Sequence, residues 1–368
     1  MNERKYVKSF DTLKGIAILI TVTIGHYWQF TPGEYWCQGT EGWFTNFTNG
    51  ITHFSFKTYT FMELLLMISG FQMFYQYEKI ANKKIDFNTY LKKRVIRLFP
   101  MAILSTVVMI IGLMYYKSLT GESWYGTELN GRFIIENLLC IQSWGNTFHT
   151  LNGTLWYVSV YFFCCILYFF LIRIGEKVNI KYTIMFVPVI LGVFLGDKSL
   201  DVLLLNYDMC RGYLGFFAGV LVACVASKLS KKKIYIISGI FILWYIIYYT
   251  FYNGAIYTDN ALDKVLPTMV FFYAPLLMLF SVNEKLDKVV GNKVMAGLGK
   301  ISYSLYIWNF PIFLWAVVLD IRFELQIPFA VNYMYWIMVG IQILIAVISY
   351  FKIEKPIYAK LEKIIAKE

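Results

Sequence analysis

Long apolar runs recur along the chain from Ile16 to Ile353, and short polar segments separate them. A helix that crosses a bilayer needs about 20 mostly apolar residues. Ten segments meet or approach that length: 11–31, 54–77, 97–116, 155–172, 182–196, 208–227, 234–252, 265–281, 303–320 and 331–352. The pattern predicts an all-α polytopic membrane protein, a bundle of about ten transmembrane helices.

Composition supports this prediction. Hydrophobic residues make up 58% of the chain and charged residues 15%, and the mean hydropathy is +0.55. Average soluble domains carry roughly 25% charged residues, so this chain lacks the polar surface that a soluble fold needs. No internal repeat is visible, and only a short tail follows the last apolar run. We therefore expect residues 1–368 to form a single membrane-embedded domain with no soluble appended domain.

The basic residues predict the orientation in the membrane. If the N-terminus is inside, 27 of the 34 lysines and arginines fall in cytoplasmic segments. Cytoplasmic loops of membrane proteins carry such an excess, so we expect both termini in the cytoplasm of a cell with the chain in its plasma or inner membrane. The net charge of +11 could also suggest a nucleic-acid partner. The basic residues flank apolar runs and form no continuous stripe, which argues against nucleic acid.

The two longest outer connections, roughly 32–53 and 117–154, are rich in aromatic and polar residues. Loops longer than about 15 residues are often functional, and aromatic side chains stack on sugar rings. An aromatic belt at the membrane interface explains the same composition, so both interpretations stay open. Cys37 and Cys140 lie in or near these loops, where a disulfide between them is conceivable. No CxxC pair or Cys/His cluster occurs, so we expect no metal site.

Ionisable residues inside apolar spans are costly and are functional by default. His26 lies about 18 Å above Lys14 on the first span, at 1.5 Å per residue, which places it in the outer half of the membrane. An imidazole there is suited to act as a general base for a hydroxyl group. A histidine that is merely hydrogen-bonded within the bundle is the alternative.

Three other groups of charged residues invite interpretation. Arg94 and Arg97 share a helix face at the cytosolic entry to the third span, where they would bind either lipid headgroups or a phosphorylated cosubstrate. Glu63, in the second span, needs a partner or a proton. Asp208 and Arg211 are spaced to pair with each other on the sixth span, which would make them structural.

Six segments together resemble one family, the bacterial membrane-bound acyltransferase family 3. They are FDTLKGIAILITVTIGH (10–26), ISGFQMF (68–74), KKRVIRLFP (92–100), GTLWYVSVYF (153–162), GKISYSLYIWNFPIF (299–313) and IEKPI (353–357). Each is similar to a short family motif, and they occur in the family's order. Each segment is weak evidence alone, whereas six in order across nearly the whole chain are a specific signal.

The resemblance implies a ten-helix core that takes an acyl group, commonly acetyl, from cytosolic acyl-CoA. It implies an O-acetyltransferase whose acceptor is a hydroxyl of an extracytoplasmic or lipid-linked saccharide, such as a cell-surface polysaccharide or a glycolipid. His26 becomes the expected catalytic residue, and Arg94 and Arg97 become the expected contacts of the donor. Supporting roles fall to seven further residues within or close to the motifs: Asp11, Lys14, Glu63, Ser69, Trp156, Tyr306 and Asn309.

The chain departs from the family pattern at two places. The family usually spaces the basic residue and the histidine eleven residues apart, which puts them about 20° apart around a helix. Lys14 and His26 are twelve apart, which on a regular helix means about 120°. A π-bulge, which inserts one residue, would restore the common face. Asn309 stands where the family usually has histidine, so a proton-shuttling role at that position is in doubt.

A rival function belongs to another class. Ten spans, the intramembrane Glu63 and His26, and a basic cytosolic face also suit a proton-coupled secondary transporter or a glycan flippase. Such a carrier would move unmodified substrate and would not need acyl-CoA. The identity of the acceptor and acyl group, a covalent acyl-enzyme and the oligomeric state, including a homo-oligomer, are left open by the sequence.

Overall fold

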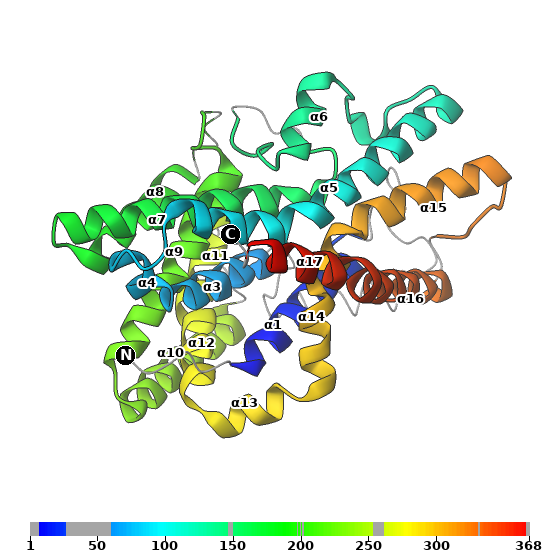
Figure 1. Cartoon of the computed structure of the whole chain (residues 1–368). Coiled ribbons are helices and arrows are strands. Elements are labelled where there is room, and N and C mark those ends of the chain that lie inside the picture. The colour runs from blue at the N-terminus through cyan, green and yellow to red at the C-terminus, as the bar shows by residue number, and fades with distance from the viewer. Residues whose placement is uncertain are drawn as a thin grey trace. The chain divides into compact units, whose positions relative to one another are not determined.

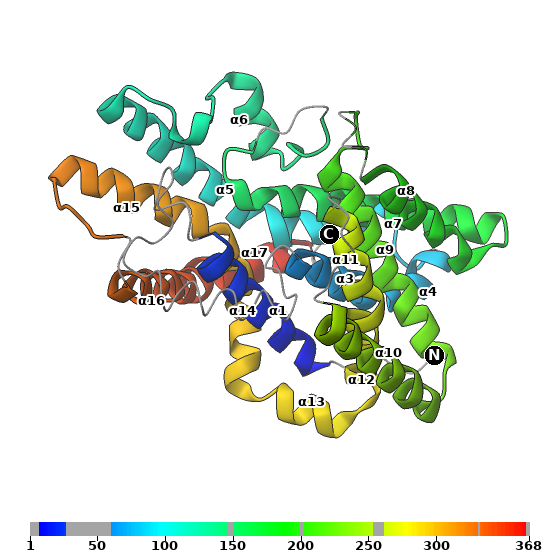
Figure 2. The same ribbon diagram turned by 180° about the vertical axis from the view of Figure 1, so that it is seen from behind.

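The computed structural model describes residues 7–26, 60–145, 150–196, 198, 200, 202–252, 261–329 and 332–365. Every regular element among these residues is helical, as Figures 1 and 2 show from opposite sides. The all-α fold class is therefore confirmed for the described part of the chain. The described residues divide into two compact units, and each is treated by itself below.

The first unit takes the described residues within Met1–Ala17, Thr52–Tyr90 and Val160–Lys300, and the second takes the rest. Eight of the described helices lie wholly in the first unit. Seven of them are α3 (Thr60–Phe74), α4 (Tyr77–Ala81), α8 (Phe186–Gly196), α9 (Tyr207–Lys228), α10 (Lys231–Tyr252), α11 (Ala261–Thr268) and, after a π-helical turn, α12 (Ala274–Val282). The short α13 (Glu284–Val290) follows them in the same unit. Four helices lie wholly in the second unit: α6 (Gly131–Leu138), α15 (Asn309–Phe323), α16 (Asn332–Ser349) and α17 (Lys355–Ile365). The boundary falls inside α1 (Lys8–Ile20), α5 (Phe87–Thr120), α7 (Trp156–Lys177) and α14 (Lys293–Ile307).

Several helices are long and apolar enough to cross a membrane. Within the described residues there are five such stretches, at Phe87–Thr120, Gly153–Lys177, Tyr207–Lys228, Val265–Val282 and Tyr333–Ile364. A sixth is obtained if α14 and α15, which bend by 55° at their junction, count as one span. These helices support a multi-pass membrane protein. The count of ten spans and the cytoplasmic position of the termini stay predictions.

The break between α14 and α15 has a chemical cause. In a continuous α-helix the carbonyl of Ile307 would accept a hydrogen bond from the N–H four residues later, but that residue is Pro311, which has no N–H. Asn152 Nδ2 donates to the Ile307 carbonyl instead, at 3.0 Å, and also lies 3.2 Å from Ser105 Oγ. The bend is thus secured by a buried asparagine from the segment that precedes α7.

Glycines allow helices of the first unit to pack closely. A Cβ added at Gly219 of α9 would lie 2.1 Å from the Met67 carbonyl oxygen of α3, and one at Gly70 would overlap the backbone of Phe216. Gly15 of α1 meets Gly299 of α14 in the same way, and these two helices lie side by side in Figures 1 and 2. Small residues at helix contacts are typical of membrane bundles.

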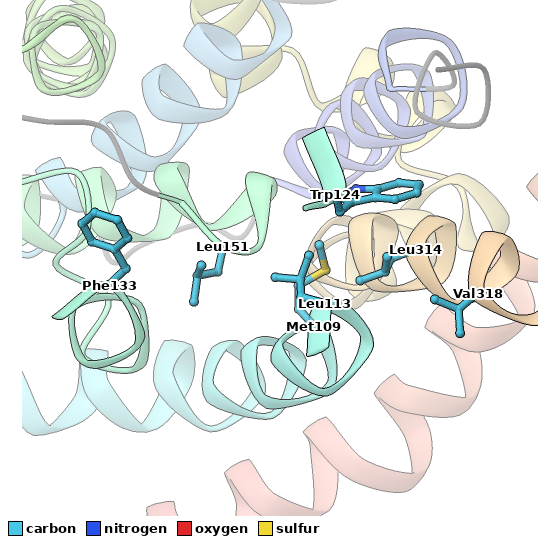
Figure 3. Packing of buried hydrophobic residues seen from close by; sticks show 7 residues of the cluster. All are labelled: Met109, Leu113, Trp124, Phe133, Leu151, Leu314 and Val318. Atoms are coloured by element: carbon cyan, nitrogen blue, oxygen red, sulfur yellow. The ribbon is translucent and has the colours of Figure 1, made fainter. Parts of the chain in front are cut away.

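The second unit contains an apolar cluster that organises the long connection between α5 and α7. Met109 and Leu113 of α5 pack with Trp124 of that connection and with Leu314 of α15 (Figure 3). The remaining buried members of the cluster are Phe133, Leu151 and Val318. Part of this connection is therefore folded core, and Trp124 is buried within it.

Candidate functional site

His26 ends the first helix of the chain, directly after a π-helical turn at Thr21–Gly25. Its backbone N–H bonds to the Thr21 carbonyl at 3.0 Å, five residues back, and not to Val22 as in an α-helix. A π turn holds one residue more than an α turn, and such turns are frequent at functional sites. The structure thus contains the one-residue insertion that the spacing of Lys14 and His26 requires, and places it at the histidine.

Asn309, the first residue of α15, connects His26 to the rest of the second unit. Asn309 Oδ1 lies 2.8 Å from His26 Nδ1, and Asn309 Nδ2 lies 3.3 Å from the Val22 carbonyl oxygen. A backbone carbonyl only accepts, so the side facing Val22 must be the amide nitrogen, and Oδ1 must face His26. The Val22 carbonyl is the one that the π turn releases from its α-helical bond with His26.

The orientation of Asn309 sets the proton arrangement of the histidine. Because Asn309 Oδ1 only accepts, His26 Nδ1 must carry a hydrogen and donate it. In the neutral ring, Nε2 then keeps its lone pair and can take up a proton. A carbonyl or carboxylate on the second ring nitrogen orients catalytic histidines in the same way. Asn309 cannot shuttle a proton, but it can hold the base in its working tautomer.

Gln342 of α16 completes this buried chain of side chains. Its Oε1 accepts a hydrogen bond from Asn309 Nδ2 at 3.2 Å, and the residue is only 1% exposed. Its Nε2 has no hydrogen-bond partner among the described residues. Asn309 and Gln342 are both fully enclosed, so the polar chain is shielded from solvent.

Two aromatic rings lie against the imidazole. The Phe310 ring meets it edge-on, with 5.4 Å between ring centroids, and the Tyr306 ring lies 6.4 Å away. Phe310 can approach because residue 153 is glycine: a Cβ there would lie 2.2 Å from the Phe310 ring. Tyr157 packs edge-on against Tyr306 at 6.0 Å. Trp156, another predicted site residue, touches Tyr157 and so lies behind this aromatic wall.

A second polar cluster lies where α14 faces the end of α16. A π-helical turn at Tyr350–Glu354 follows α16, and Glu354 accepts a hydrogen bond of 2.5 Å from Ser304 Oγ. Trp308 Nε1 donates to Ser349 Oγ at 2.7 Å. Ser349 and Gln342 are seven residues apart on the regular part of α16, about 10 Å at 1.5 Å per residue. The same helix therefore connects this cluster with the histidine site.

The two predicted donor-binding arginines belong to α5. Arg94 is half-buried and Arg97 is exposed. Their i, i+3 spacing makes them neighbours on one face of the helix. Arg97 interacts electrostatically with Glu354 and with Tyr303. The Tyr303 hydroxyl donates to the Leu98 carbonyl of α5 at 2.5 Å, which ties α14 to the helix that carries the arginines. The arginines that are predicted to bind the donor thus lie beside the Ser304–Glu354 cluster.

The other predicted site residues lie in the first unit. Lys14 Nζ is 3.8 Å from Asp11 Oδ1 and donates to Gln72 Oε1 at 3.0 Å. Lys14 and Asp11 therefore form a salt bridge one helical turn apart. Ser69 Oγ donates to the Leu65 carbonyl within α3 at 2.8 Å, a bond that supports the helix.

The partner of Glu63 corrects one prediction. We expected Arg211 to pair with Asp208, but Arg211 Nε lies 2.5 Å from Glu63 Oε1, and both side chains are buried. The carboxylate of α3 is thus neutralised across the interface with α9. Asp208 adds only its electrostatic influence to this pair. The i, i+3 spacing brings Asp208 and Arg211 close enough to pair. The buried guanidinium of Arg211 instead bonds to Glu63, whose carboxylate lies within bonding distance across the helix interface.

Four residues of the second unit were missed by sequence reasoning: Ser304, Gln342, Ser349 and Glu354. Ser304 lies in the motif segment 299–313 and Glu354 in the motif segment 353–357, so the motifs themselves pointed to these two residues. Gln342 carried only the oddity of an amide in an apolar run. The described residues hold no group of three potential metal ligands. Cys140 is buried, and its suggested partner Cys37 lies outside the described residues.

Comparison with known proteins supports the family suggested by the motifs. The model of the acyltransferase domain of acyltransferase family 3 matches residues 7–351, nearly the whole chain. The comparisons with curated proteins and with solved structures gave no match. The match includes His26, the arginines of α5, the break before Asn309 and all of α16. With its apolar helices, the chain is a multi-pass membrane protein that belongs to the acyltransferase family 3.

Proposed function

We propose that the protein transfers an acyl group, acetyl in the simplest case, from cytosolic acyl-CoA to a hydroxyl group of a saccharide or glycolipid acceptor. The observation that carries this proposal is the bond between His26 and Asn309. It leaves His26 Nε2 as a free base beside the Phe310 and Tyr306 rings, and activating a hydroxyl nucleophile requires such a base.

In this mechanism His26 Nε2 takes the proton of the acceptor hydroxyl while its oxygen attacks the thioester carbonyl carbon. The charge on the ring is stabilised because Asn309 Oδ1 holds the Nδ1 hydrogen. When the tetrahedral intermediate collapses, the protonated ring returns the proton to the leaving CoA sulfur. The base is thereby regenerated, and the products are the ester and CoA.

The donor end of the site is assigned to Arg94 and Arg97. Guanidinium groups match the phosphates of CoA in charge and geometry. Before the donor binds, Glu354 provides a counter-charge for Arg97 and is itself held by Ser304. We place the pantetheine arm alongside α16, between Ser349 and Gln342. A thin chain of this kind would deliver the acyl group to His26 while CoA stays in the cytosol.

For the acceptor, the described residues of the connection between α5 and α7 include one exposed aromatic side chain next to the apolar cluster. Tyr125 is exposed and adopts a left-handed backbone conformation with φ 46°. Its ring packs edge-on against the buried Trp124. We assign Tyr125 to stacking on a sugar ring, whereas Trp124 belongs to the apolar cluster.

The test compares permeabilised membranes from cells that express the wild-type chain or His26→Ala. Radiolabelled acetyl-CoA is added, and incorporation of label into membrane-bound saccharide is measured. Native acceptors are present in such membranes, so their identity need not be known beforehand. We expect label with the wild type and its loss with His26→Ala at equal protein level. Transport of unmodified saccharide that is independent of acyl-CoA would instead establish the carrier or flippase.

A further inference from the structure

The Nε2 of Gln342 is a buried polar group of the histidine site that the mechanism above does not use. Gln342 is 1% exposed, and its Nε2 bonds to no described residue. An enclosed amide N–H without an acceptor is destabilising, so a site that retains one has a use for it. A ligand with a suitably placed acceptor oxygen would remove this penalty.

The amide of Gln342 cannot turn around to relieve the problem. Asn309 Nδ2 is directed by the Val22 carbonyl, and it also donates to Gln342 at 3.2 Å. Only Gln342 Oε1 can accept this bond, because a nitrogen there would face another nitrogen donor. Gln342 Nε2 is therefore the end of this amide that does not bond to Asn309.

Asn309 links the amide of Gln342 to the imidazole of His26. One amide group and two hydrogen bonds, of 2.8 and 3.2 Å, separate His26 Nδ1 from Gln342 Oε1. Asn309 orients both neighbours with one side chain: its oxygen sets the tautomer of His26, and its nitrogen sets the direction of Gln342. A rigid pair of a base and a hydrogen-bond donor is what acyl transfer requires.

We propose that Gln342 Nε2 donates a hydrogen bond to the carbonyl oxygen of the transferred acyl group. The proposal rests on the proposed function. When the acceptor oxygen forms its bond to the carbonyl carbon, the C=O π electrons move onto the carbonyl oxygen. The hydrogen bond from Gln342 to that carbonyl oxygen then strengthens. When the C–S bond breaks, the double bond re-forms, and the sulfur leaves with the proton held by His26.

A purely structural role predicts something different. If Gln342 serves only to hold Asn309, any side chain with an acceptor oxygen at the same place will suffice. Gln342→Glu provides that oxygen and replaces the NH₂ group by a second oxygen. A buried carboxyl group that is protonated can still donate a hydrogen bond, whereas its ionised form cannot. This variant therefore separates the two roles by pH.

The experiment uses the permeabilised membranes and radiolabelled acetyl-CoA described above. Gln342→Leu is expected to lower kcat about 100-fold, the typical effect of losing one oxyanion donor, while the KM for acetyl-CoA changes little. Gln342→Glu is expected to keep activity at low pH and to lose it progressively as the pH rises, relative to the wild type. Ile341→Leu, the adjacent position on α16, is the matched control and should behave as the wild type.

The outcomes are distinguishable. If the wild type shows no incorporation that depends on His26, the proposed function fails, and this inference fails with it. If incorporation depends on His26 but Gln342→Leu has wild-type kcat, the function stands and the donor role is overturned. If Gln342→Leu does not fold, Gln342→Glu decides: a pH profile parallel to that of the wild type overturns the proposal, and the added loss at high pH supports it.

Discussion

Asn309 Oδ1 lies 2.8 Å from His26 Nδ1, although the two residues are 283 positions apart in the chain. The contact joins the end of a π turn to the start of α15. Asn309 is one of the two places at which this chain departs from the family pattern, and the proposed function gives it a role there. An asparagine cannot exchange a proton, but at this distance it determines which nitrogen of the histidine does.

Changing Asn309 tests this role. Asn309→Leu is expected to lower kcat about 10- to 100-fold, because Nδ1 loses its acceptor and His26 loses its preferred tautomer and orientation. Asn309→His should retain more activity, because a neutral imidazole still offers one acceptor and one donor. The measurement is acetyl incorporation in membranes. Equal activity of Asn309→Leu and the wild type would show that the contact is not needed.

Gly153 is predicted to matter through Phe310. A methyl group at this position would overlap the Phe310 ring at 2.2 Å, so Gly153→Ala should displace the ring from the edge of His26. We expect a loss of kcat of about tenfold, as small misplacements near the chemistry are costly. Gly131→Ala is the control, because a Cβ there meets open space. Similar activity of the two alanine variants would contradict the prediction.

The arginines of α5 should act on donor binding. Arg97→Ala is expected to raise the KM for acetyl-CoA about tenfold or more, with a smaller effect on kcat, because the guanidinium binds a part of the donor that does not react. Arg94→Ala should act in the same direction. Lys93→Ala, which removes an exposed charge from the same segment, is the control for general electrostatic attraction. An equal rise of KM in Lys93→Ala would assign the effect to charge alone.

The ion pair between Glu63 and Arg211 should contribute to stability. Arg211→Met leaves a buried carboxylate without its cation, which costs about 3–5 kcal/mol. The thermal stability of the purified protein in detergent should fall clearly. The exposed pair of Arg132 and Glu136, with Arg132 66% exposed, is the matched comparison. Arg132→Ala should lower the free energy of unfolding by about 1 kcal/mol or less. A comparable loss of stability in both variants would contradict the prediction that burial makes the Glu63–Arg211 pair more important.

Arg211→Met can destabilise the protein by leaving the Glu63 carboxylate unpaired or by disturbing the packing of α3 on α9, and a double variant separates these two effects. If the loss comes from the unpaired carboxylate, then Glu63→Met combined with Arg211→Met should recover much of the stability, since apolar replacements of buried pairs are often neutral. Failure of the double variant to recover would indicate that the pair is needed for close packing of α3 on α9.

Much of the fold could be read from local properties of the sequence. Apolar runs predict membrane helices because each run must satisfy its backbone hydrogen bonds within itself. Lys14 and His26 are twelve residues apart where the family that the motifs resemble usually has eleven, and helix geometry then suggested a π turn as the remedy. The π turn lies at Thr21–Gly25. It leaves the Val22 carbonyl without its α-helical bond, and the side chain of Asn309, from α15, donates to that carbonyl instead.

By itself, then, the sequence determined the all-helical membrane class, the family motifs and the identity of His26, Arg94 and Arg97 as candidates. The membrane class follows from composition and the apolar pattern, whereas the resemblance of the motifs to the family implied the roles of these three residues. Tertiary structure alone decided that Glu63 bonds to Arg211, 148 positions away, and that Asn309 directs both His26 and Gln342. Buried polar groups bond to whatever partner the packing brings within about 3 Å, and no local pattern contains that information.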